Sequence, residues 1–144
     1  MTSRRTARTT AARTLAASLA VPALLLARCG ASADEQRLEA FCEQVPDLLS
    51  DITDDVNAVY SDPQSAPDVL NEAVGKLEEV QPPADAEEVW GDLVSSWRAF
   101  TDLIESADLS DPSANTDLAE EATRLQGDLV SAGEAVDTFG QENC

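Results

Sequence analysis

Histidine is absent from the chain, and lysine occurs once, at Lys76. Without histidine, the chain lacks the side chain that usually activates a serine or cysteine nucleophile and that completes most zinc and di-iron sites. The glycines are scattered, so the sequence holds no glycine-rich phosphate-binding loop. The acidic stretch 108–120 lacks the central glycine and the final glutamate of a calcium-binding EF-hand loop. We therefore expect no catalytic residues, no metal ligands and no cofactor.

Cationic residues are also scarce, and they are unevenly distributed. Residues 1–33 contain no Asp or Glu, and their arginines are Arg4, Arg5, Arg8, Arg13 and Arg28. Residues 34–144 carry all 28 acidic residues against four cationic ones, which leaves a formal charge of −24. Those four are Arg37, Lys76, Arg98 and Arg124. An acidic surface of this kind repels nucleic-acid phosphates, so it excludes nucleic-acid binding through a basic patch, and it disfavours adsorption to anionic lipid.

The first 33 residues have the composition of an export signal. Arginines at the start precede an apolar run from Leu15 to Ala27, which is shorter than the ~20 apolar residues that a membrane-spanning helix needs. A basic segment followed by a short apolar run is typical of a secretory signal peptide. We therefore expect the protein to be exported, with residues 34–144 as one acidic domain.

Two cleavage sites are compatible with this signal. In the first, Leu26-Ala27-Arg28-Cys29 acts as a lipoprotein box, Cys29 is lipidated, and residues 30–33 form a small flexible tether. Arg28 departs from that box, whose residue before the cysteine is normally small. In the second, Ala31-Ser32-Ala33 is cut before Asp34, and the domain is secreted. The protein would then contact the membrane only through its signal peptide or a lipid on Cys29.

The cysteine count agrees with export. Either cleavage lipidates or removes Cys29, so Cys42 and Cys144 are left as a pair. Two cysteines in an exported domain predict a disulfide. In the chain-entropy model, closing a loop of roughly one hundred residues contributes up to about 4.7 kcal/mol.

Four stretches show apolar residues at helical steps of three and four, and none shows strand-like alternation. We expect helices over residues 34–60, from Ser65 to the prolines at 82–83, over 85–107, and from Leu118 to the C-terminus. Pro46 is expected to kink or split the first helix, and Ser65 to cap the second. The sequence predicts an all-α, up-down-up-down four-helix bundle closed by the terminal disulfide, because that topology brings Cys42 and Cys144 to the same pole.

Aromatic residues are the candidate ligand-binding groups. Trp90, Trp97 and Phe100 share one face of the third expected helix. Burial in the core is the simpler interpretation of this face, and an aromatic-lined pocket near the Pro82-Pro83 pole is the alternative. Acidic clusters such as Asp51 and Asp54 are interpreted as solvated surface.

Short motifs add a resemblance. They are Phe41-Cys42, Pro82-Pro83-Ala84-Asp85 ahead of Trp90, and the final Glu142-Asn143-Cys144, after a signal that ends in a cysteine. Together they make the chain similar to small helical lipoproteins exported by high-GC actinobacteria. The resemblance implies a location in the cell envelope, a helical fold and the terminal disulfide, and it implies no activity.

Three functional hypotheses follow. The first is a non-enzymatic module of the cell envelope, lipid-anchored on the outer face of the cytoplasmic membrane or secreted, which binds an envelope protein or a small ligand. The second is a carrier of an apolar ligand on the Trp90/Trp97 face. An enzyme is the third and least favoured, because no residue set supports a reaction.

Overall fold

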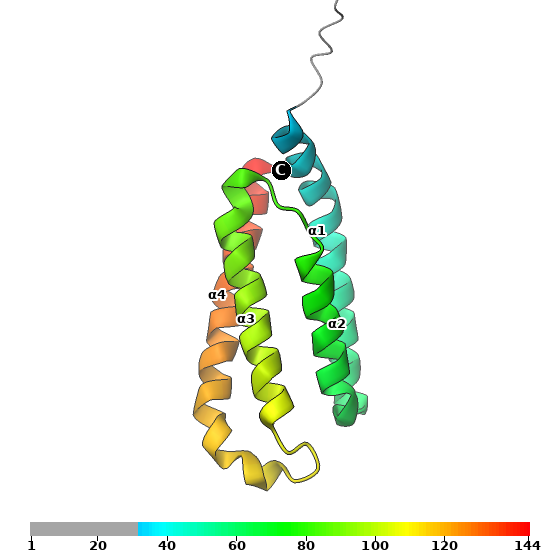
Figure 1. The fold of residues 1–144 in the computed structure, drawn as a ribbon, viewed down its shortest axis with the longest axis vertical. Coiled ribbons are helices and arrows are strands. Elements are labelled where there is room, and N and C mark those ends of the chain that lie inside the picture. The colour runs from blue at the N-terminus through cyan, green and yellow to red at the C-terminus, as the bar shows by residue number, and fades with distance from the viewer. Residues whose placement is uncertain (1–31) are drawn as a thin grey trace, which may run out of the picture.

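The computed structural model describes residues 32–144, which form four long helices running alternately up and down (Figure 1). The helices are α1 (Ala33–Ala58), α2 (Ala66–Glu78), α3 (Glu87–Ser106) and α4 (Ala119–Asn143). Short 3₁₀ segments lie between them: η1 (Val59–Ser61), η2 (Pro63–Ser65), η3 (Ala84–Ala86) and η4 (Pro112–Leu118). The predicted all-α, up-down-up-down bundle is confirmed. The expected signal peptide and Cys29 lie outside the described residues.

The start of α1 is fixed by a capping box. The Ser32 hydroxyl accepts a hydrogen bond from the Glu35 N–H, and the Glu35 carboxylate accepts one from the Ser32 N–H. These two bonds satisfy amide groups that have no partner within the helix. Helix α1 therefore begins before Asp34, the expected first residue of the domain.

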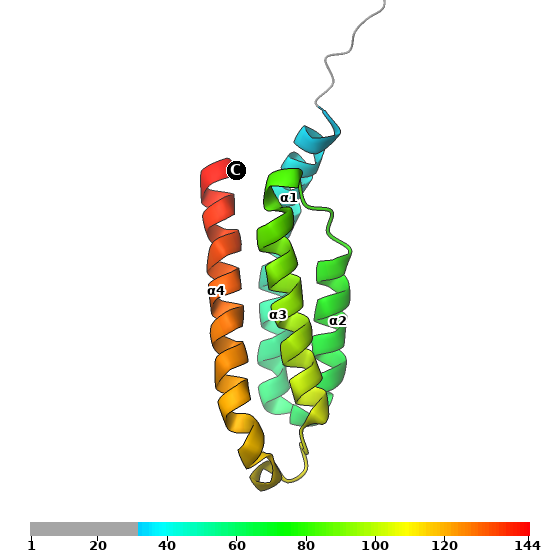
Figure 2. The same cartoon turned by 60° about the vertical axis from the view of Figure 1, so that its left-hand side comes forward.

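Two local expectations differ from the structure. Helix α1 continues through Pro46, so the helix is not split there, and Figure 2 shows its first turns, in blue, leaning away from α4. Ser65 precedes α2 but does not cap it, because its hydroxyl donates to the Asp62 carbonyl instead. The second residue of α2 is Pro67, which has no N–H to donate to the Ser65 hydroxyl.

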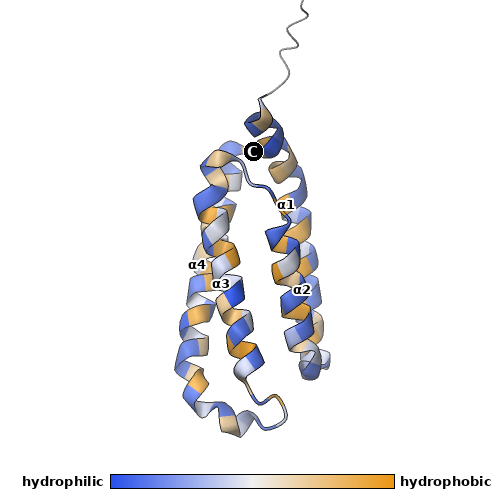
Figure 3. Cartoon of the chain, viewed as in Figure 1, coloured by the Kyte–Doolittle hydropathy of each residue, from blue (hydrophilic) through white to orange (hydrophobic). Residues whose placement is uncertain are grey.

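A single apolar core runs between the helices. Figure 3 shows apolar and polar residues mixed along every helix, the pattern of amphipathic helices that each bury one stripe. Ile52 of α1 and Leu77 of α2 are the largest fully buried side chains among the described residues. Helix α3 packs extensively on α4 and α2, whereas α1 packs mainly on α2. The α1–α4 interface is therefore the most open side of the bundle.

Aromatic contacts hold the core together near the pole where the chain ends. The Phe41 ring meets the rings of Trp90 and Phe139 edge to face, with centroids 5.3 and 5.8 Å apart. The Trp90 indole Nε1 donates a hydrogen bond to the Leu77 carbonyl at 3.1 Å. These contacts link all four helices, and such aromatic pairs add about 0.5–1.5 kcal/mol beyond the area they bury.

Asp34 ties the α2–α3 connection to the first turn of α1. Its Oδ1 accepts a hydrogen bond from Arg37 at 2.8 Å and another from the Ala84 N–H at 2.9 Å. These donors, with the Arg37 bond as the larger cause, hold the pKa of the Asp34 carboxyl below its ordinary value. The contact keeps η3 in place just ahead of the buried Trp90.

The predicted disulfide is confirmed. Cys42 of α1 bonds to Cys144, with 5.6 Å between the two Cα atoms and a sequence separation of 102. The start of α1 and the end of α4 lie at the same pole (Figure 1), as the bundle topology requires. The bond therefore joins the first and last helices of the bundle.

Replacing both bonded cysteines with serine should lower the free energy of unfolding by up to about 4.7 kcal/mol, because the unfolded chain regains the freedom that the closed loop removes. Urea unfolding measured with and without reductant checks this expectation. Reduction should bring the wild-type chain to the stability of the double variant and leave that variant unchanged. Equal stability of the oxidised and reduced wild-type chain would contradict the prediction.

Candidate functional site

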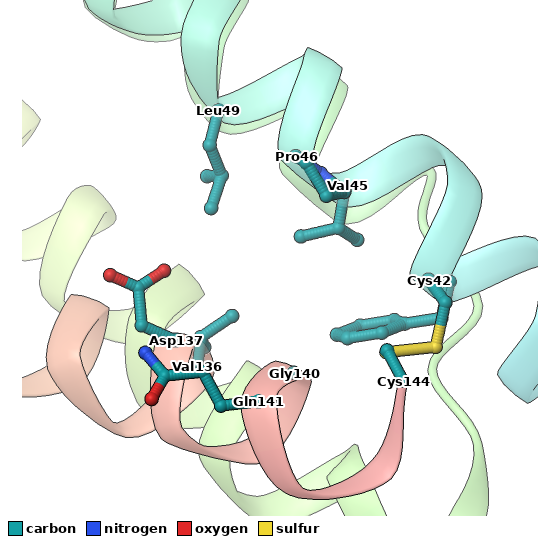
Figure 4. A pocket seen from close by; sticks show the side chains of 10 residues that line it. Cys42, Val45, Pro46, Leu49, Val136, Asp137, Gly140, Gln141 and Cys144 are labelled. Carbon is teal, nitrogen blue, oxygen red and sulfur yellow. A yellow bond between two sulfur atoms is a disulfide. The ribbon is translucent and has the colours of Figure 1, made fainter.

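A groove opens between α1 and α4 beside the disulfide (Figure 4). Its volume is about 390 Å³, within the range of small-ligand sites. The lining residues are Phe41, Cys42, Val45, Pro46, Leu49, Val136, Asp137, Gly140, Gln141 and Cys144. In Figure 4 the α1 side chains face those of α4 across an open space, and the disulfide closes one end.

The shape of the groove follows from the packing of its two walls. Helix α1 rests mainly on α2, so its remaining side is incompletely covered by α4. The α4 wall is thin at Gly140, where an added Cβ would meet no atom within 4 Å. The disulfide fixes the separation of the walls at the pole, which leaves a gap that the side chains do not fill.

The walls of the groove are apolar and its edge is polar. Val45 and Val136 are buried, with 4% and 3% of their surface exposed, while Leu49 is half-buried. Asp137 and Gln141 lie exposed at the edge. Among the lining residues Asp137 carries the one ionisable side chain, because both cysteines are oxidised. The groove therefore suits an apolar group.

All four cationic residues in the described part of the chain are engaged in ion pairs. The pairs join Arg37 to Asp34, Lys76 to Asp55 and Glu72, Arg98 to Glu78, and Arg124 to Glu121 and Asp128. They lie at the surface, where an ion pair contributes about 0–1 kcal/mol. Most of the acidic residues, Asp137 among them, have no cationic partner within residues 32–144.

In the acidic loop between α3 and α4, the Asp108 carboxylate finds its hydrogen-bond donors within the loop itself. The Asp108 carboxylate accepts hydrogen bonds from the Ser110 hydroxyl and from the N–H groups of Ser110 and Asp111. These bonds hold the pKa of Asp108 below its ordinary value, with the Ser110 hydroxyl as the largest cause. Residues 32–144 contain no group of three or more acidic or cysteine side chains placed to hold a metal ion.

The predicted aromatic face lies apart from the groove. Trp90 is a core residue with 3% of its surface exposed, and Trp97 packs against the same core while half-buried. Phe100 is also half-buried. None of the three lines the α1–α4 groove. Cys29, the predicted lipidation site, lies outside the described residues.

Sequence reasoning did not find the groove, because the apolar stripes of α1 and α4 were both assigned to the core. Val45, Leu49 and Val136 belong to those stripes, and nothing in their spacing says which ones a facing helix fails to cover. The glycines beside the α4 stripe do not mark the groove either, because Gly140 lines it and Gly133 does not.

Comparison of the chain with protein-family models, with curated proteins and with solved structures gave no match. Among residues 32–144, no helix is both long and apolar enough to cross a membrane. The description of the site therefore rests on the geometry of this chain.

Replacing Trp90 with phenylalanine should destabilise the bundle by about 0.5–1.5 kcal/mol, because the buried hydrogen bond from the indole N–H to the Leu77 carbonyl is lost while the Val80 N–H still donates to that carbonyl. Urea unfolding monitored by circular dichroism measures the change. Trp97→Phe is the matched control, and it should cost less because Trp97 is half-buried. Equal effects of the two substitutions would contradict the role of Trp90 as the buried link between α2 and α3.

Proposed function

We propose that this chain is a non-enzymatic binding module of the cell envelope and that the groove between α1 and α4 is its binding surface. The observation that carries the proposal is an apolar groove of about 390 Å³ on an otherwise strongly acidic domain. Apolar walls that remain in contact with water gain free energy when a ligand covers them, by about 25 cal/mol per Å². A bound ligand would cover this exposed apolar surface.

Export is the second part of the proposal. It is supported by the basic and apolar halves of residues 1–33 and by the disulfide, because disulfides persist in oxidising compartments. The capping box at Ser32 favours the lipidated form over the secreted one. A cut before Asp34 would remove the cap of α1, at a cost of about 1 kcal/mol, whereas a start at Cys29 retains it.

The non-enzymatic role is supported by the chemistry of the groove. Catalysis by acid–base or nucleophilic routes needs at least two groups held within reach of one another. Asp137 carries the only ionisable side chain of the groove lining. A carrier of a small apolar ligand is the second candidate, and the observation that favours it is the same groove rather than the Trp90/Trp97 face.

The intact mass of the natively expressed protein tests export and anchoring. We expect a chain that starts at Cys29 and carries additional lipid mass, with two alkylatable thiols that appear after reduction. A Cys29→Ser variant should lose the lipid mass and keep the disulfide. A chain that starts at Asp34 would show that the domain is secreted, and an uncleaved chain would contradict export.

Filling the groove tests whether it binds. Gly140→Leu places a side chain in the groove, and Gly127→Leu is the matched control on the same helix, because Gly127 has equally open surroundings and does not line the groove. Gly140→Leu should weaken binding of the neutral dye Nile red by at least about tenfold, since a leucine side chain excludes apolar area worth about 1.5–3 kcal/mol. Fluorescence titration gives the affinities.

Both variants should fold, because leucine favours the helix over glycine by about 0.8 kcal/mol. Thermal unfolding of the two variants checks this condition. Equal dye binding by Gly140→Leu and Gly127→Leu would show that the groove is not the binding surface.

A further inference from the structure

The groove is elongated along the axes of its two walls. On α1 its lining runs from Phe41 to Leu49, which is a little over two helical turns or about 12 Å. On α4 it runs from Val136 to Cys144, over the same length. The groove thus has the direction and the length of a short helix.

The border of the groove is anionic. Asp137 lies at its edge on α4, and Glu43 is exposed on α1, one turn before the groove residue Pro46. Neither carboxylate is in an ion pair within residues 32–144, because the four cations there are paired elsewhere. The groove therefore combines an apolar floor with negative charge that no side chain of the described domain neutralises.

We infer that, if the groove is the binding surface proposed above, its occupant is a basic amphipathic helix of a partner protein. Such a helix presents apolar residues at positions i, i+3 or i+4, and i+7, which span about 10.5 Å and match the two turns of the groove. Lysine or arginine residues beside that ridge would lie against Asp137 and Glu43. The groove lies between two antiparallel helices, α1 and α4, so its long direction follows their axes.

Charge decides against the other common occupants of an apolar groove. A fatty acid or an anionic phospholipid would place its negative head beside Asp137, on a domain with a formal charge of −24. A partner helix with acidic flanks meets the same repulsion. Cationic flanks are attracted over a distance of about 10 Å at moderate salt, so they also speed the encounter.

Three designed helical peptides separate the contributions of charge and apolar contact. The first has a leucine ridge at i, i+3, i+4 and i+7 with lysine flanks, the second has the same ridge with glutamate flanks, and the third has lysine flanks with serine in place of leucine. Each carries a fluorophore, and binding to the mature exported chain is measured by anisotropy at low and high salt.

We expect the leucine–lysine peptide to bind and the other two to bind at least tenfold more weakly. Its affinity should fall as salt increases, and Gly140→Leu should reduce it while Gly127→Leu does not. Asp137→Asn should weaken it by about twofold to fivefold, the effect of one exposed ion pair. Asp102→Asn on α3 makes the same change of charge away from the groove and should have a smaller effect.

Five results would overturn the inference. Equal binding of the serine–lysine peptide, or no effect of Gly140→Leu, would mean adsorption to the acidic surface. Equal binding of the glutamate peptide would remove the role of charge. A cationic detergent that binds where no peptide does would identify a small amphiphile as the occupant. A dimer that Gly140→Leu converts to a monomer would identify a second copy of this chain.

The proposed function can fail or survive separately. Nile red binding that Gly140→Leu abolishes would support the groove as a binding surface even if no peptide binds. If the wild-type chain binds neither the dye nor any of the peptides, the proposed function and this inference are both rejected.

Discussion

The covalent bond between Cys42 and Cys144 constrains the one interface of the bundle that packing leaves weak. Helix α3 lies close to α2 and α4, and α2 lies close to α1, but the backbones of α1 and α4 approach each other closely at few points. Loop closure by the disulfide removes conformations from the unfolded chain and holds the two outer helices together at one pole. With that separation fixed, the helices do not need a continuous apolar interface. The groove is the space that results.

The scarcity of cations leaves both the surface of the domain and the edge of the groove acidic. Each cation of the described domain already neutralises carboxylates on neighbouring turns or helices, as Lys76 does for Asp55 and Glu72. Self-repulsion of the remaining carboxylates disfavours the compact state and is reduced by salt. The Phe41, Trp90 and Phe139 cluster lies beside the disulfide, so the best-packed part of the core supports the end of the groove.

Much of the fold could be predicted from the sequence, and the candidate site could not. Helical spacing gave the four helices, and the pairing of Cys42 with Cys144 agreed with their order, because both depend on local pattern and cysteine count. Of the kink or split expected at Pro46, the split does not occur, although proline removes a backbone donor and disrupts an isolated helix. Ser65 is a residue type that often caps helices, but here its hydroxyl bonds to Asp62 in the 3₁₀ turn that precedes α2. The groove depends on how closely two helices approach, which no spacing within one helix encodes.

The position of the disulfide has a mechanical consequence. The N-terminal end of the described chain, the cross-link and the groove lie at one pole of the bundle (Figure 1). A pulling force between a partner held in the groove and the chain preceding Ser32 would pass along the first turns of α1, directly to the α1 wall of the groove and across the sulfur–sulfur bond to its α4 wall. Helices α2 and α3 would lie outside this load path. The bundle would bear tension through a covalent link, and most of its core would stay unloaded.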